Sequence, residues 1–214
     1  RPFMAENSCP LCGSKGRSFF ADEKHRFFTC DFCRGIFRAP EQALNFEQER
    51  NRYLLHKNHL EDQGYLNFVS PILAEVRSRY KPGAEGLDFG CGHTPVISEV
   101  LKKDKYLVDH YDPLFFPQKI FEGKTYDFIV CCEVMEHFLN PKEEFVLLAE
   151  LLKPTGNLIC MTSVFSEEMD FDSWYYKNDP THVFLYRKET LAHITANCNF
   201  SHVKIEEPLI VFSK

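Results

Sequence analysis

Residues 87–95 read LDFGCGHTP, an apolar run that holds one aspartate and leads into two glycines one residue apart. Because glycine readily adopts positive φ and has no side chain, it lets the backbone pass close beneath a ligand. A glycine turn after the first strand of an α/β sheet commonly does so. A dinucleotide-binding turn would add a third glycine, whereas residues 93–97 read HTPVI. The stretch therefore predicts an α/β fold with a turn for a nucleotide-like cofactor, and it argues against a dinucleotide.

The rest of the chain beyond residue 86 alternates strand-like and helix-like apolar runs. This alternation predicts a doubly wound, Rossmann-like sheet that is mostly parallel, and the last two runs predict an antiparallel hairpin on its edge. Segment 113–126 is too short to hold a helix and a further parallel strand. The sheet is therefore predicted to lack the usual third strand.

Composition limits the class of protein further. The 214 residues, 44% of them hydrophobic, suffice for one α/β domain and a small appendage. The net charge of −6 and the absence of a long run of like charges do not fit a general nucleic-acid binder. The sequence has no stretch of about 18 apolar residues and no secretory signal at its start. We expect a cytoplasmic protein without a membrane partner, and the sequence does not indicate an oligomeric state.

Four of the nine cysteines form two C-x-x-C pairs separated by 17 residues. This spacing is typical of a structural zinc site, in which four thiolates close the coordination shell. A segment this short cannot bury a core of its own, so a bound metal would supply its folding energy. The sequence predicts a zinc ribbon over residues 1–40 with the ligands Cys9, Cys12, Cys30 and Cys33.

The role of this ribbon is open between two interpretations. Basic residues alternate with aromatic ones, and such a mixture can form a platform on which nucleic-acid bases stack. Alternatively the aromatic rings are the ribbon's small core and the charges solvate it. The rings are Phe19, Phe20, Phe27, Phe28, Phe32 and Phe37.

Two further units follow the ribbon. Residues 41–63 are polar with interspersed apolar positions, which predicts a helical linker that can act as a lid. From residue 64 the apolar positions follow a 3.6-residue period, and we predict that the main domain covers residues 64–214.

Three stretches in order, LDFGCG, YDFIVCCEVMEHFLNP and LLKPTGNLICMTS, resemble the motifs of class I S-adenosylmethionine-dependent methyltransferases. The resemblance covers roughly residues 64–214, although Thr94 stands where that family often has a third glycine. It implies S-adenosylmethionine as cofactor, with Asp88 near its methionine end and Asp112 at its ribose. The glycine turn would comprise Gly90, Cys91 and Gly92, and the candidates for contact with the adenine are Pro113, Leu114 and Cys132.

The EVMEH stretch, residues 133–137, resembles an E-x-x-E-H element of two groups of O-methyltransferases, one acting on the 3′ ends of small RNAs and one in the ubiquinone pathway. In the RNA group this element and a later histidine bind a divalent cation that holds two vicinal hydroxyls. The resemblance thus implies a Mg²⁺ or Mn²⁺ site. Its ligands would be Glu133, Glu136, His137 and His182.

The same stretch has a second interpretation without metal. Glu136 can serve a helix N-terminus, His137 can act alone as a general base, and His182 can be an ordinary loop residue. The catalytic candidates are Glu136, His137 and His182.

These observations predict an S-adenosylmethionine-dependent methyltransferase that methylates an oxygen of a small molecule. The acidic balance and the aromatic stretch 171–179, FDSWYYKND, favour a small acceptor. RNA is the alternative acceptor, because the ribbon is basic and aromatic and the layout resembles that of zinc-ribbon rRNA base methyltransferases. A non-catalytic module that binds the cofactor and recruits a partner through the ribbon also stays open.

Overall fold

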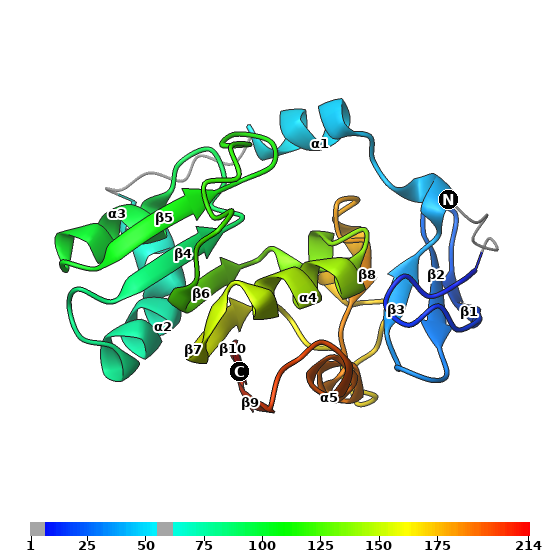
Figure 1. The fold of residues 1–214 in the computed structure, drawn as a ribbon. Helices are drawn as coiled ribbons and strands as arrows, with labels where there is room; N and C mark the ends of the chain where they lie inside the picture. Colours follow the sequence, from blue (N-terminus) through cyan, green and yellow to red (C-terminus); the bar gives the residue numbers. More distant parts are fainter. Residues whose placement is uncertain (1–6, 55–61) are drawn as a thin grey trace.

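The computed structural model describes residues 7–54 and 62–214, in which the chain forms two sheets (Figure 1). The larger sheet has the strand order β5-β4-β6-β7-β10-β9. Its strands are β4 (Glu85–Phe89), β5 (Leu107–Tyr111), β6 (Tyr126–Cys132), β7 (Leu152–Met161), β9 (His202–Glu206) and β10 (Leu209–Ser213).

The direction of these strands confirms the predicted fold class. β5, β4, β6 and β7 are parallel, whereas β10 runs antiparallel to both β7 and β9 and forms the terminal hairpin. β5 lies at the free edge of the sheet, and segment 113–125 after it holds turns and no named strand. The described residues therefore lack the third strand, as the short segment predicted.

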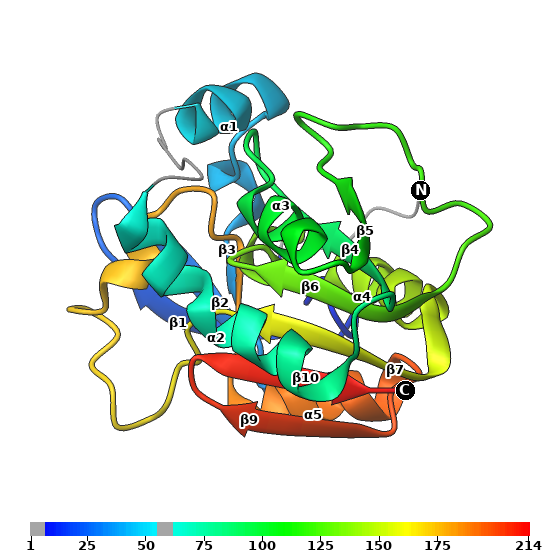
Figure 2. The same ribbon diagram turned by 90° about the vertical axis from the view of Figure 1, so that its left-hand side faces the viewer.

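Helices cover both faces of this sheet (Figure 2). α2 (Gln63–Arg79) and α3 (Val96–Lys103) lie on one face, and α4 (Pro141–Glu150) and α5 (Lys188–Asn197) on the other. The central strand β6 shows why. Its residues Phe128 and Val130 belong to the core beneath α2 and α3, whereas Ile129 and Cys131 belong to the core beneath α4 and α5. Alternate side chains of a strand point to opposite faces, so a strand buried on both faces is apolar throughout. No helix of the described ranges has the length and apolar character to cross a membrane.

The smaller sheet is shared between the two ends of the chain. β1 (Gly16–Ala21), β2 (Arg26–Cys30) and β3 (Ile36–Arg38) form an antiparallel ribbon, to which β8 (Phe184–Leu185) adds a fourth strand. A Cβ on Gly35 would lie 2.4 Å from Cζ of Phe184, so this glycine lets the ring pack beside the ribbon. The sequence did not indicate this shared sheet. The predicted boundary at residue 40 stays a prediction, and residues 1–6 lie outside the described ranges.

The ribbon's aromatic residues form a core together with the main domain. Phe19, Phe20 and Phe27 each place their ring centroid 4.9–5.3 Å from that of Phe171. Of the six ribbon phenylalanines within the described ranges, only Phe32 is largely exposed, at 69%. The rings are thus mostly core residues, but the core spans both parts of the chain.

Residues 41–63, predicted to be helical, contain α1 (Phe46–Tyr53), while residues 55–61 lie outside the described ranges. α1 begins with a capping box between Asn45 and Gln48, which satisfies backbone donors at the helix start. In Figure 1 it lies at the top, between the ribbon and the carboxyl ends of the parallel strands. This position places α1 over the candidate site.

Candidate active site

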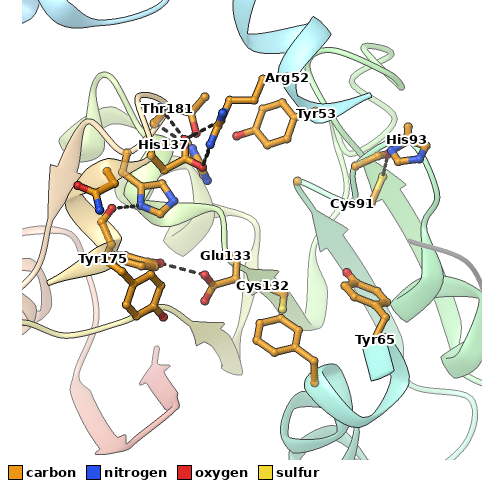
Figure 3. A pocket seen from close by; sticks show the side chains of 17 residues that line it. Arg52, Tyr53, Tyr65, Cys91, His93, Cys132, Glu133, His137, Tyr175 and Thr181 are labelled. Atoms are coloured by element: carbon orange, nitrogen blue, oxygen red, sulfur yellow. Dashed lines mark hydrogen bonds and ion pairs between the residues drawn. The ribbon is translucent and has the colours of Figure 1, made fainter. Parts of the chain in front are cut away.

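Two adjoining cavities lie where the parallel strands β4 and β6 end, the usual ligand position in α/β sheets. The first has a volume of about 580 Å³ and the second about 420 Å³, both within the range of small-molecule sites. Figure 3 shows the first cavity, with Glu133 and Cys132 between Tyr65 and Tyr175. The residues that line both cavities, and so join them, are Tyr53, Gly90, Gly92, Glu133 and His137.

The glycine turn follows β4 and requires glycine for two different reasons. Gly90 has a φ of +80° and Gly92 a φ of +68°, which residues with a side chain rarely adopt. A Cβ on Gly90 would also lie 2.5 Å from a methyl carbon of Val134, whereas a Cβ on Gly92 would meet nothing within 4 Å. The turn therefore packs directly against the residues that follow β6.

We expect Gly90→Ala to lower the free energy of unfolding by about 3 kcal/mol, because backbone strain and overpacking add. Gly92→Ala is the matched control and should cost about 1 kcal/mol, since it carries the strain alone. Urea unfolding of both variants measures the difference. Equal losses would show that the contact with Val134 relaxes without cost.

Asp112, predicted to hold a ribose, joins the glycine turn to the next loop. One carboxylate oxygen accepts a hydrogen bond from the backbone N–H of Gly92 at 2.9 Å. The other accepts from the N–H groups of Leu114 and Phe115 at 2.9 and 3.2 Å. A carboxylate has room for further donors. Asp112 lines the second cavity, so it is accessible to a ligand there, and its contact with a ribose stays a prediction.

The other predicted cofactor contacts divide between the cavities. Pro113 and Leu114 line the second cavity with Asp112, whereas Cys91 and Cys132 line the first. Cys132 thus lines a different cavity from Pro113 and Leu114, the other candidates for the adenine. Which of them meets the base stays a prediction.

Asp88 lies beneath the turn and lines neither cavity. It is 3% exposed, and its carboxylate accepts hydrogen bonds from the backbone N–H and the hydroxyl of Ser98 in the first turn of α3. Burial raises the pKa of Asp88 to about 6, from an ordinary value of 3.8. Its predicted contact with the cofactor stays untested, and its visible role is to hold α3 against β4.

The raised pKa of Asp88 has a consequence for stability. The fold favours the protonated carboxyl of Asp88 over the ionised one. The stability that this preference contributes is fully present below pH 3.8 and is lost as the pH rises through about 6. Asp88→Asn keeps an acceptor for Ser98 without the charge. We expect its free energy of unfolding to exceed the wild-type value by about 2 kcal/mol at pH 8.

Urea unfolding at several pH values between 4 and 8 measures this gain. Asp31→Asn, at a side chain that is 63% exposed, is the control and should show no comparable gain. A gain for Asp88→Asn that does not grow with pH would contradict the burial argument.

The EVMEH stretch makes a tight turn directly after β6. Glu133 has a φ of +52°, an uncommon value for a residue other than glycine, and the 3₁₀ turn η2 (Met135–His137) follows. Residues held in such conformations are concentrated at functional sites. The turn puts Glu133 on the wall of both cavities and buries Glu136 completely.

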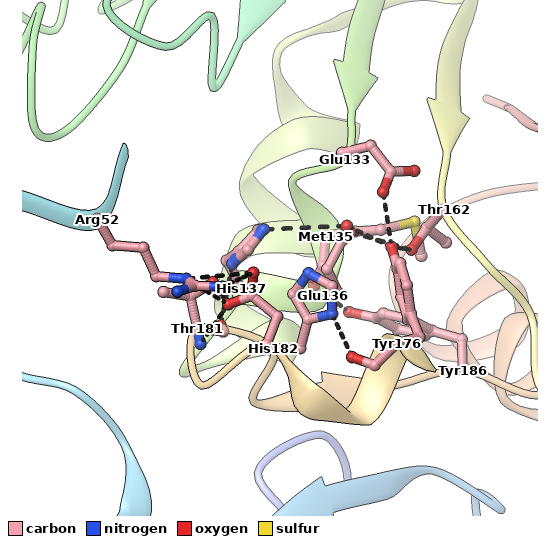
Figure 4. Close-up of polar contacts among 11 residues, drawn as sticks. Arg52, Glu133, Met135, Glu136, His137, Thr162, Tyr176, Thr181, His182 and Tyr186 are labelled. Carbon is pink, nitrogen blue, oxygen red and sulfur yellow. Dashed lines mark hydrogen bonds and ion pairs between the residues drawn. The ribbon is translucent and has the colours of Figure 1, made fainter. Parts of the chain in front are cut away.

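The two glutamates meet at a tyrosine hydroxyl (Figure 4). The hydroxyl oxygen of Tyr176, in the 3₁₀ turn η3 (Tyr175–Asn178), lies 2.5 Å from a Glu136 oxygen and 3.0 Å from a Glu133 oxygen. Thr162 donates its hydroxyl to the other Glu136 oxygen at 3.0 Å. Burial raises the pKa of both glutamates, and the charge of Glu136 raises that of Glu133 further. Burial therefore favours the neutral forms, and full ionisation of the pair would need a positive group beside it.

Two histidines lie next to this pair, each oriented by a backbone carbonyl. Nδ1 of His137 lies 2.9 Å from the Thr181 oxygen, and Nδ1 of His182 lies 2.7 Å from the Tyr176 oxygen. Carbonyl partners make each Nδ1 the donor, which presents Nε2 as the basic nitrogen. Burial, with a smaller effect of His137, lowers the pKa of His182 to about 4 and keeps it neutral.

One ligand atom from each of Glu136, His137 and His182 lies within 4.8 Å of the other two. Nε2 of His137 is 3.9 Å from a Glu136 oxygen, and the two imidazole centroids are 4.9 Å apart. The structure thus brings together three of the four predicted cation ligands. Glu133 is outside this group and reaches it through Tyr176.

The four predicted zinc ligands also converge. The sulfur atoms of Cys9, Cys12, Cys30 and Cys33 all lie within 4.8 Å of one another. The Cys9–Cys33 and Cys12–Cys30 sulfur distances are 3.5 and 3.4 Å, and none of the nine cysteines, all of which lie in the described ranges, forms a disulfide. This arrangement suits a single tetrahedral ion.

Several residues of the site had not been singled out from the sequence. Arg52 of α1 donates to both carboxylate oxygens of Asp179, and the ring of Tyr53 lies 5.5 Å from that of His137. No sequence pattern marks these α1 positions. Thr162 follows β7 directly, and the rule that ligand sites lie at the ends of parallel strands could have identified it.

The sheet order, the glycine turn and the cleft at the strand ends define the class as that of S-adenosylmethionine-dependent methyltransferases, as predicted. A family model described as a methyltransferase domain matches residues 57–205. The chain therefore belongs to the methyltransferase domain family. No curated protein matches it in sequence.

The solved structures that share its fold include three methyltransferases with TM-scores above 0.5. An O-methyltransferase family protein from Burkholderia thailandensis is 14% identical with a TM-score of 0.55, covering 79% of this chain and 63% of that one. A 1,6-didemethyltoxoflavin-N1-methyltransferase from the same organism is 13% identical with a TM-score of 0.54, covering 92% and 99%. A phosphoethanolamine N-methyltransferase from Haemonchus contortus is 14% identical with a TM-score of 0.53, covering 80% and 48%. This chain thus spans less than two thirds of the first of these proteins.

Proposed function

We propose that the chain transfers a methyl group from S-adenosylmethionine to an oxygen of a small acceptor, with a divalent cation at Glu136, His137 and His182. One observation carries the proposal: a buried carboxylate and two imidazoles converge beside the cleft, and both imidazoles have Nδ1 at a backbone carbonyl. Metal-bound histidines are usually held in this way. Because two of the three ligands are nitrogen, Mn²⁺ suits the set better than Mg²⁺.

The second cavity is the proposed position of the cofactor's adenosyl group. Asp112 and the glycine turn bound it on one side, and Phe121 and Phe138 supply apolar surface. The toxoflavin methyltransferase, which shares this fold, was solved with S-adenosylhomocysteine bound. The first cavity adjoins the second at Gly90 and Glu133 and is left for the acceptor.

The lining of the first cavity supports a flat acceptor. Tyr53, Tyr65, Phe68 and Tyr175 give it aromatic walls, and Glu133 gives it an acidic floor. The basic residue Arg52 is paired with Asp179, so it is not an obvious phosphate contact. Structural neighbours named for toxoflavin and phosphoethanolamine also take small substrates. These features favour a small molecule over RNA.

The proposed chemistry needs alignment and the removal of one proton. A bound cation would lower the pKa of an acceptor hydroxyl and orient it. The aromatic walls would hold the acceptor so that its oxygen faces the methyl group, which is the main task in methyl transfer. Because Nε2 of His137 would be bound to the cation, the proton of the acidified hydroxyl would pass to water in the cleft. Without the cation, His137, which lines both cavities, would accept that proton.

We further propose that the four-cysteine cluster holds zinc. Four thiolates leave the ion no open position, so its role would be structural. Three of the four cysteines are buried, which fits a closed site.

Calorimetric titration tests the function. S-adenosylhomocysteine is titrated into zinc-loaded protein, and catechol is then titrated with and without Mn²⁺. We expect micromolar cofactor binding and catechol binding that requires Mn²⁺. Cofactor binding with no cation-dependent catechol binding would refute the cation and leave His137 as a base acting alone. Absence of cofactor binding by folded protein would refute the transferase.

A further inference from the structure

One arginine of the ribbon reaches into the loop that carries His182. Arg38, in β3, is 5% exposed, and its guanidinium donates hydrogen bonds to three backbone carbonyls. Nη2 lies 2.8 Å from the Lys177 oxygen and 2.9 Å from the Asp179 oxygen. Nε lies 3.0 Å from the oxygen of His182 itself. A single side chain thus holds residues 177–182 in one curved conformation.

The same loop is continuous with the candidate cation site. The backbone N–H of Arg38 donates to the backbone carbonyl of Val183 at 2.9 Å, and the N–H of Val183 donates to the backbone carbonyl of Glu136 at 2.9 Å. The Asp179 carboxylate is bound from the other side by Arg52. The loop therefore lies between the ribbon, α1 and the EVMEH turn.

A buried guanidinium is costly unless its donors are satisfied. Here the partners are carbonyl oxygens that converge only in this loop conformation, and the ring of Phe27 stacks 4.6 Å from the guanidinium carbon. If the loop left this conformation, the buried guanidinium of Arg38 would lose its hydrogen-bond acceptors. The electrostatic cost thus favours the geometry that brings His182 to Glu136 and His137.

We propose that Arg38 is a positioning residue of the active site, so that the ribbon completes the acceptor side of the cleft. This inference rests on the proposed function in one respect, the role of His182 as a cation ligand. It assigns the ribbon a structural task in catalysis, distinct from docking RNA or recruiting a partner.

The test compares Arg38→Lys with Arg17→Lys. Lysine keeps the charge but lacks the planar fork that reaches three carbonyls. Arg17 lies in the same ribbon and pairs with Asp31 on the surface. We expect Arg38→Lys to weaken Mn²⁺ binding about 10- to 100-fold, the usual effect of losing a group that orients a metal ligand. Binding of S-adenosylhomocysteine should stay within twofold, and Arg17→Lys should change neither.

Hydrogen exchange and nitrogen NMR make the result independent of the cation. The amides of residues 177–183 should exchange faster in Arg38→Lys, and the ¹⁵N shifts of the His182 ring should move. Should Arg38→Lys fail to fold, Arg38→Gln, which is uncharged, is measured in its place. Wild-type Mn²⁺ affinity in the variant, or equal losses of Mn²⁺ and S-adenosylhomocysteine affinity, would overturn the proposal.

A wild-type protein that binds no Mn²⁺ would refute the cation instead. The NMR comparison then decides the role of Arg38: a shifted His182 ring supports positioning, and an unchanged ring with unchanged loop exchange overturns it.

Discussion

Glu136→Gln is expected to weaken Mn²⁺ binding by about 100-fold or more while the protein stays folded. The carboxylate is fully buried and is the anionic member of the three-residue cluster. Glutamine has the same shape, and its amide oxygen can accept one of the hydroxyls of Tyr176 and Thr162 while its NH2 group donates to the other, so packing changes little. The loss would come from the missing charge beside the cation. Calorimetry or manganese electron paramagnetic resonance measures the affinity.

Glu133→Gln is the matched control for this experiment. Glu133 shares the Tyr176 hydroxyl with Glu136 but lies outside the cluster of converging ligand atoms. We expect its Mn²⁺ affinity to fall only a few-fold, by loss of a nearby charge. Equal losses in the two variants would mean that Glu133 is also a ligand, as the sequence resemblance implied. No loss in either would refute the cation site.

Cys30→Ser is expected to release the zinc and to destabilise the protein by about 5 kcal/mol or more, because structural zinc contributes folding energy outright. The effect should extend beyond the ribbon. Phe27, three residues before Cys30, packs on Phe171 of the main domain, and β3 pairs with β8. Zinc content by atomic emission and urea unfolding measure the two losses.

Cys198→Ser is the control. Cys198 is buried like Cys30, but it lies at the C-cap of α5, far from the four-cysteine cluster in the sequence. It should keep its zinc and lose about 1–2 kcal/mol for burying a hydroxyl. Full zinc content in Cys30→Ser would contradict a four-thiolate site. Loss of zinc with unchanged unfolding of the main domain would show that the shared core holds without the metal.

Local sequence patterns were sufficient to predict most of the main sheet, its glycine turn and the cysteine cluster. The turn at Gly90 and Gly92 needs glycine whatever surrounds it, and the run of β6 is apolar because both of its faces are covered. The missing third strand followed from the length of segment 113–126 alone. The cysteine spacing identified four sulfurs that do converge. In each case the signal lies in one short stretch or in a fixed spacing along the chain.

The relations between distant segments were decided by the tertiary structure. The resemblance implied Glu133 and Glu136 equally as cation ligands, but the positive φ of Glu133 turns the chain and leaves Glu136 with the two histidines. Tyr176 joins the two carboxylates from 40 residues away, and Arg38 reaches the His182 loop from 144 residues away.

By itself, then, the sequence determined the α/β class, the glycine turn and the four cysteines that converge, because periodicity, backbone freedom and cysteine spacing can be read along the chain. The tertiary structure decided which carboxylate meets the histidines and that the ribbon shares its core with the main domain. Hydrogen bonds and ring contacts of this kind depend on where separate elements pack, and no pattern along the chain encodes that packing.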